Sequence, residues 1–74
     1  MPNRRVIISF VAPEHSGKTI LEAAFAKILT EHGISVVLPP DPQRDAKMAL
    51  SLAELLSSFR GKGASVLFME SNAT

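Results

Sequence analysis

Three short apolar runs punctuate the chain, at residues 6–11, 34–38 and 66–69. They are rich in β-branched and aromatic side chains and show almost no polar alternation, a pattern typical of strands buried on both faces of a parallel sheet. The pattern therefore predicts three buried strands.

Between these runs the apolar residues recur at helical spacing. The first such segment begins near Ile20 and meets a helix-ending glycine at Gly33. The second, with Asp45 as its predicted N-cap, is expected to end at Gly61 and Gly63. Its apolar stripe consists of Met48, Leu52, Leu55, Leu56 and Phe59.

The order strand, helix, strand, helix, strand predicts an α/β fold: a three-stranded, mostly parallel sheet with two helices (β-α-β-α-β), in one domain over residues 1–74. Pro39-Pro40-Asp41-Pro42 follows the second run. We expect the chain to turn there without forming a helix or a central strand, because proline lacks a backbone donor.

Composition limits the possible functions of this domain. At 74 residues and 46% hydrophobic content, the chain can form only a thin core, and it has no cysteine to reinforce it. The net charge is only +1, and the charged residues are scattered along the sequence, so we expect no nucleic-acid partner. The apolar runs are far shorter than the roughly 20 residues that span a bilayer, so we expect no membrane partner and a cytoplasmic location.

The candidate chemistry lies in Ala12-Pro13-Glu14-His15-Ser16-Gly17-Lys18-Thr19, between the first predicted strand and helix. This segment matches a relaxed Walker A pattern. Backbone N–H groups of residues 14–19 would surround an anion at the helix N-terminus. Gly17 would admit the phosphates, Lys18 would contact their β and γ oxygens as the candidate catalytic residue, and Thr19 would bind Mg²⁺. The alternative is a glycine-containing turn without a ligand.

The segment and its context resemble the P-loop NTPase superfamily, and the loop is most similar to those of small nucleotide and nucleoside kinases. The resemblance implies Mg²⁺ with ATP or GTP as the ligand and a metal-binding acid at Glu70, which ends the third run. Ala12 departs from the family pattern by replacing a glycine. The predicted cofactor-binding residues are Glu14, His15, Ser16, Gly17, Lys18 and Thr19, with Glu14 pointing outward and His15 either near a phosphate or base or exposed to solvent.

A further cation for the phosphates would come from Arg44, Lys47, Arg60 or Lys62. Arg44 is favoured because it follows the second predicted strand at its carboxyl end, where parallel sheets bind ligands. Its alternative is a solvated charge in a helix. Asp41 either meets Mg²⁺ or an acceptor, or is a turn residue beside proline.

Two function classes remain open. In the first, the protein binds a nucleoside triphosphate and slowly hydrolyses it or transfers a phosphoryl group. In the second, it is a non-catalytic regulator or inhibitor that binds a larger protein. An open sheet edge and the wide apolar face of residues 48–59 favour a homo-oligomer or a protein partner in either case.

Overall fold

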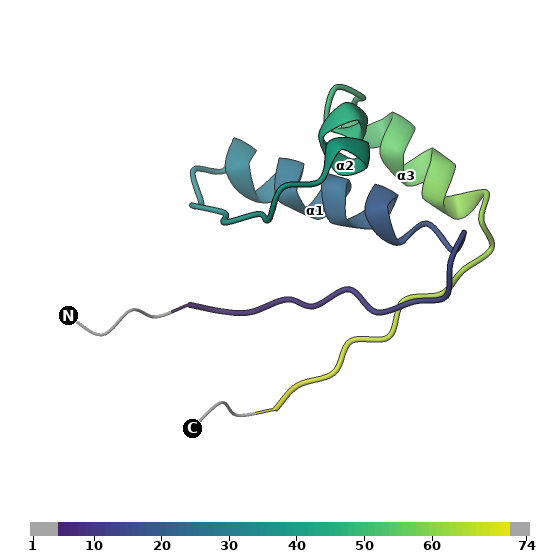
Figure 1. Cartoon of the computed structure of the whole chain (residues 1–74), viewed down its shortest axis with the longest axis horizontal. Coiled ribbons are helices and arrows are strands. Elements are labelled where there is room, and N and C mark those ends of the chain that lie inside the picture. The colour runs from purple at the N-terminus through teal and green to yellow at the C-terminus, as the bar shows by residue number, and fades with distance from the viewer. Residues whose placement is uncertain (1–4, 72–74) are drawn as a thin grey trace.

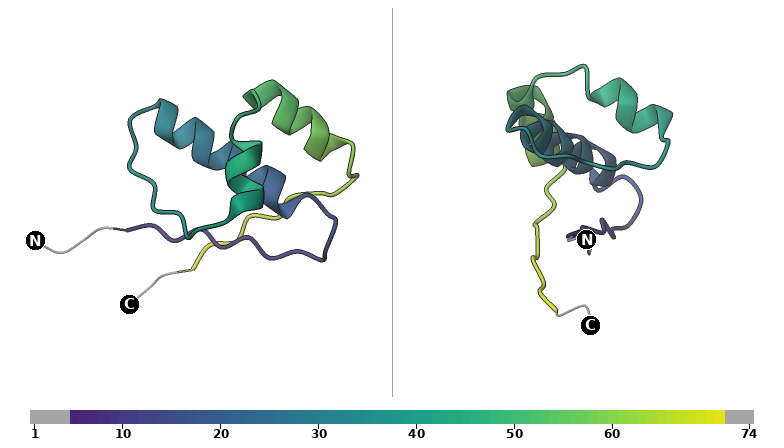
Figure 2. Two further views of the ribbon diagram at one scale, coloured as in Figure 1. Left: turned by 45° about the horizontal axis from the view of Figure 1, so that its top comes forward. Right: turned by 90° about the vertical axis from the view of Figure 1, so that its left-hand side faces the viewer.

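The computed structural model describes residues 5–71, and in that range three helices are joined by extended segments (Figure 1). Helix α1 comprises Lys18–Glu31, α2 Pro42–Lys47 and α3 Leu52–Arg60. Both shorter helices pack against α1. The two terminal segments, residues 5–12 and 64–71, run along the other side of α1 (Figures 1 and 2).

The predicted three-stranded α/β sheet is wrong, because residues 5–71 contain no β-strand. All three apolar runs are extended, but no backbone hydrogen bond joins any two of them within this range. Residues 64–71 also run opposite to residues 5–12, whereas the predicted sheet required parallel neighbours (Figures 1 and 2).

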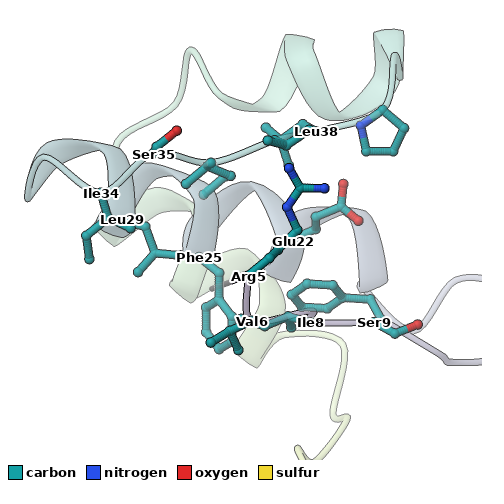
Figure 3. Close-up of a pocket in the computed structure, with 15 residues that line it drawn as sticks. Arg5, Val6, Ile8, Ser9, Glu22, Phe25, Leu29, Ile34, Ser35 and Leu38 are labelled. Carbon is teal, nitrogen blue, oxygen red and sulfur yellow. The ribbon is translucent and has the colours of Figure 1, made fainter. Parts of the chain in front are cut away.

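The physical reason is separation between the runs. Residues 5–10 and 34–39 lie on different walls of a cavity of about 780 Å³, with α1 side chains between them (Figure 3). Paired strands lie only about 4.8 Å apart. The apolar side chains consequently stay in solvent: Val6 is 86% exposed and Leu67 is 82% exposed. The apolar pattern thus corresponds to an extended backbone in each run, but no run is paired with another in residues 5–71.

Helix α1 confirms the first helix prediction, including its end at Gly33. The N–H of Ile34 donates to the Leu29 carbonyl at 3.0 Å, and the N–H of Gly33 donates to the Thr30 carbonyl at 3.1 Å. Gly33 has a φ of 77°, the left-handed conformation that glycine adopts without steric cost. These two bonds form a Schellman motif, which satisfies the last carbonyls of the helix.

The second predicted helix is wrong in its extent, because two helices occupy that part of the chain. Asp41, not Asp45, is the N-cap of α2, and its side chain accepts hydrogen bonds from the N–H groups of Gln43 at 3.0 Å and Arg44 at 3.3 Å. Pro42 is the first helical residue. The proline-rich segment therefore starts a helix, because a first-turn residue needs no N–H partner.

Helix α3 begins with a capping box. The Ser51 hydroxyl accepts from the Glu54 N–H at 3.2 Å, and the Glu54 carboxylate accepts from the Ser51 N–H at 3.0 Å. The helix ends at Arg60 with Gly61 as its C-cap, as predicted. Reciprocal capping gives this nine-residue helix a fixed starting point.

The core lies between α1 and α3. Ile20, Ala23, Ala24 and Leu55 are buried, and Met48, Leu52 and Phe59 pack around them. The two alanines leave room for the Leu55 side chain, which is fully buried. Close packing of a small core means that single methylene groups matter to stability.

Aromatic contacts hold the terminal segments to α1. The Phe25 ring on α1 meets Phe10 edge to face with centroids 5.6 Å apart, and it stacks on Phe68 at 6.4 Å. Such pairs contribute about 0.5–1.5 kcal/mol beyond their buried area. Phe25 is therefore a common attachment point for residues 5–12 and 64–71.

We predict that Leu55→Ala lowers the free energy of unfolding by about 2–5 kcal/mol, because it removes the central core side chain and leaves a cavity. The matched control Leu67→Ala removes the same atoms from an exposed position and should change it by less than about 0.5 kcal/mol. Urea denaturation followed by circular dichroism measures both. Equal losses would show that the α1–α3 contact is not the core.

The capping box predicts a pH dependence of stability. Hydrogen bonds from the Ser51 backbone N–H, and with the Ser51 side chain, lower the pKa of Glu54. A lowered folded-state pKa adds stability above the ordinary glutamate pKa of about 4.3, and that stability is lost as the pH falls through the folded value. The urea midpoint of Glu54→Gln should therefore lie below that of the parent at neutral pH, and the two should converge in acid. A constant difference would contradict the assignment.

Candidate functional site

The loop between the first extended segment and α1 is a tight turn. His15 has a φ of 66° and Gly17 a φ of 89°, so two of its residues adopt the left-handed conformation. The Ser16 hydroxyl donates to the Pro13 carbonyl across the turn. The loop thus doubles back on itself and α1 starts directly after Gly17.

The N-terminus of α1 has no side-chain cap. Gly17 is the N-cap and accepts the first helical bond, from the Leu21 N–H at 2.9 Å, but it has no side chain to satisfy the first amides. The N–H groups of residues 18–20 find no acceptor among residues 5–71. Helices α2 and α3 are both capped by side chains. The first turn of α1 therefore keeps its donors and its positive dipole end for another acceptor.

A cavity of about 450 Å³ lies at this N-terminus. Its walls come from the loop, from the first turn of α1, from α2 and from the residues after α3. They consist of Pro13, Glu14, His15, Gly17, Lys18, Thr19, Ile20, Gln43, Lys47 and Lys62.

The cavity carries a surplus of positive charge. Lys18, Lys47 and Lys62 line it, and among the described residues Glu14 is the one carboxylate in its walls. None of the three lysines forms an ion pair with an acid in residues 5–71. The three positive charges repel one another, and an anion bound between them would offset this repulsion. The attraction for the anion is strongest at low ionic strength, where salt screens charges least.

The end of α3 closes over the loop at Gly17. A Cβ atom at this position would lie 2.8 Å from Cδ1 of Phe59 and 3.2 Å from Cγ of Lys62. Gly17 is therefore required by both its backbone conformation and its neighbours. This contact also brings Lys62 to the cavity.

Most of the predicted loop residues reach this cavity. Gly17, Lys18 and Thr19 line it as the motif predicts, and His15 also does. Glu14 borders the cavity and is exposed, and its expected outward orientation stays a prediction. Ser16, the sixth predicted residue, is absent from the lining, and its hydroxyl donates a hydrogen bond within the loop. The described residues include no cluster of metal-binding side chains.

Arg44 has a different role from either one that we expected. It is only 3% exposed, and its guanidinium donates to Glu22 on α1 at 3.1 Å and to Asp45 at 2.9 Å. The bond to Glu22, and after it the bond to Asp45, raises the pKa of Arg44. Both the cationic-finger and the solvated-charge interpretation are wrong, since Arg44 is a buried link between α1 and α2.

Glu70 is not brought to the loop. It is exposed and absent from the cavity walls, and its segment, residues 64–71, runs away from the loop (Figure 1). No group of three or more His, Asp or Glu side chains suited to a metal occurs in residues 5–71. The metal role of Glu70 stays a prediction without support from the geometry, because its expected place beside the loop assumed a parallel third strand.

The sequence analysis ranked Lys47 and Lys62 behind Arg44 and did not single out Gln43. No local motif marks these three residues. They reach the cavity only because α2 and the end of α3 pack against the start of α1. A signal was present in Asp41-Pro42, a helix-starting pair, which would have placed Gln43 and Lys47 on one short helix.

The larger cavity, shown in Figure 3, has a different character. Its labelled lining is mostly apolar, from Val6 and Ile8 on one side to Ile34 and Leu38 on the other, with Phe25 and Leu29 between them. It contains Arg5 and Glu22 but no cluster of ionisable groups like that at the loop. The candidate site is therefore the smaller, basic cavity.

Comparisons with protein-family models, with curated proteins and with solved structures each gave no match. Among residues 5–71, no helix has both the length and the apolar character needed to cross a membrane.

We predict that Gly17→Ala destabilises the protein more than Gly33→Ala does. Both positions have positive φ, which costs an alanine about 1–2 kcal/mol. A methyl group at Gly33 meets no atom within 4 Å, whereas at Gly17 it meets Phe59. Overpacking adds about 1–3 kcal/mol there. Urea denaturation of the two variants measures the difference, and equal losses would disprove the close approach of α3 to the loop.

Proposed function

We propose that residues 12–19 bind the phosphate groups of a nucleoside triphosphate, ATP or GTP. The observation that carries the proposal is the cavity that joins the uncapped N-terminus of α1 to three lysine side chains. Uncapped amides and the helix dipole favour an anion, and the lysines add full positive charges.

In this proposal the residues at the start of α1 have different parts in phosphate binding. The N–H groups of residues 18–20 donate to phosphate oxygens, and Gly17 allows the backbone to approach them. Lys18 is exposed at the cavity and acts as a mobile point charge on the phosphates. Charge-assisted hydrogen bonds, such as those from a lysine ammonium or a backbone N–H to a phosphate oxygen, are about twice as strong as hydrogen bonds between neutral groups.

Magnesium would enter with the nucleotide. Thr19, whose hydroxyl is the metal ligand in the motif, lines the cavity. Residues 5–71 offer no cluster that would hold a metal alone. Mg²⁺ commonly keeps several waters and is held by phosphates with one or two protein ligands. The residues present therefore fit a phosphate-bound Mg²⁺ and not a resident metal site.

A second candidate function is a non-catalytic regulator that binds a larger protein. The observation that favours it is the exposure of large apolar side chains on the extended terminal segments, such as Ile7 at 81% and Met69 at 87%. Their backbone groups make no hydrogen bonds to one another within the described residues, so they are open to pairing.

Lys18→Ala tests the first candidate. It should weaken ATP and GTP binding at least about tenfold, because it removes a charged hydrogen bond at the phosphates. The fold should be retained, since the side chain is exposed. Calorimetric titration with each nucleotide and Mg²⁺ measures affinity, and circular dichroism checks the helices.

Arg60→Ala is the matched control, because Arg60 is an exposed cation outside the cavity and should leave affinity unchanged. Equal affinity of Lys18→Ala and the parent would disprove the site. The absence of binding by the parent would favour the regulator.

A further inference from the structure

Lys47 and Lys62 extend the candidate site beyond the loop motif. Lys47 is the last residue of α2, and Lys62 lies two residues after the end of α3. Both line the same cavity as Lys18, which is the first residue of α1. Three cations thus converge from three different parts of the chain.

These two lysines have no structural partner that accounts for their position. Neither Lys47 nor Lys62 has a side-chain hydrogen bond or an ion pair with a residue in the range 5–71. Other cations in the same range do: Lys27 donates to the Met48 carbonyl, and Arg44 binds two carboxylates. Lys47 is half-buried and Lys62 is exposed, so neither position is explained by a contact of its ammonium group within that range.

The placement of the three charges fits an extended polyanion better than one phosphate group. A single phosphate carries up to about two negative charges and is matched by the helix amides with Lys18 alone. A chain of linked phosphates places further charge away from the helix, toward α2 and the end of α3, where Lys47 and Lys62 lie. At about 450 Å³ the cavity has room for such a chain.

The cavity offers little that would recognise a nucleobase. Within residues 5–71, no phenylalanine, tyrosine or tryptophan lines it as a surface on which a base could stack. Among the described residues that line it, Gln43 is the one with a side-chain amide, and His15 adds an imidazole. Bases are normally held by aromatic stacking together with several edge hydrogen bonds.

We infer that Lys47 and Lys62 are ligand-binding residues that, with Lys18, select a chain of three or more linked phosphates, whatever base it carries. This inference rests on the proposed function, since it assigns the ligand class of the same cavity. The phosphate chain supplies the binding energy, and a nucleoside attached to it adds little.

Calorimetric titration of the full chain with sodium tripolyphosphate, ATP, GTP and orthophosphate tests the inference, all without divalent metal. The parent should bind tripolyphosphate, ATP and GTP within about threefold of one another and orthophosphate at least about tenfold more weakly. Lys47→Gln and Lys62→Gln should each weaken tripolyphosphate binding about tenfold. Lys47→Arg and Lys62→Arg keep the charge and should retain most of the affinity.

Arg60→Gln removes the same charge next to Lys62 but outside the cavity, and it should change affinity less than about twofold. Equal losses in Arg60→Gln and Lys62→Gln would show a nonspecific charge effect and overturn the inference. Circular dichroism checks each variant for the three helices, and the arginine variants separate loss of charge from loss of fold.

Two results distinguish this inference from the proposed function. Binding of ATP or GTP without binding of tripolyphosphate, or unchanged affinity in both glutamine variants, would overturn the inference and leave nucleotide binding intact. Failure of the parent to bind any of the four ligands, with or without Mg²⁺, would overturn both.

Discussion

Leu55 is the side chain on which the helical arrangement depends, because it fills the space that Ala23 and Ala24 leave on α1. This contact fixes how α3 lies across α1. Four residues farther along, Phe59 then meets Gly17, and Lys62 follows at the rim of the loop. The shape of the basic cavity is therefore a consequence of one apolar contact near the middle of α3, and the loop sequence alone does not determine it.

A polar contact fixes α2 against α1, as the Leu55 contact fixes α3. Arg44 is buried and bonded to Glu22 on α1. The Nε atom of Arg44 has no partner among the described residues, so this contact is incompletely satisfied. Burying a charge is costly unless it is paired, and removal of one partner is usually more harmful than removal of both. The link sets the orientation of α2 and with it the position of Lys47.

Local signals in the sequence predicted α1 and the end of α3, but they did not reveal α2, and the predicted sheet was wrong. The spacing after Ile20 and the glycine at Gly33 were sufficient for α1, because helix periodicity and the C-cap are local properties. The capping box Ser51–Glu54 was also present in the sequence and would have divided the second helix. Strand pairing is nonlocal: an apolar run such as residues 66–69 specifies an extended backbone but neither its direction nor its neighbour. The same limit applied to the site, since Gly17 and Lys18 follow from the motif, whereas Lys47 and Lys62 depend on tertiary packing.

The walls of the basic cavity come from α1, α2 and the chain beyond α3, so an anion bound there would act as a noncovalent cross-link between parts that share only a small core. Ligand that binds only the folded state raises its stability by about 2.7 kcal/mol at a hundred times the dissociation constant. A gain of that size is a large part of the total for a domain this small. Occupancy of the cavity and persistence of the fold would then be one coupled equilibrium, and the concentration of the anion would set how much folded protein exists.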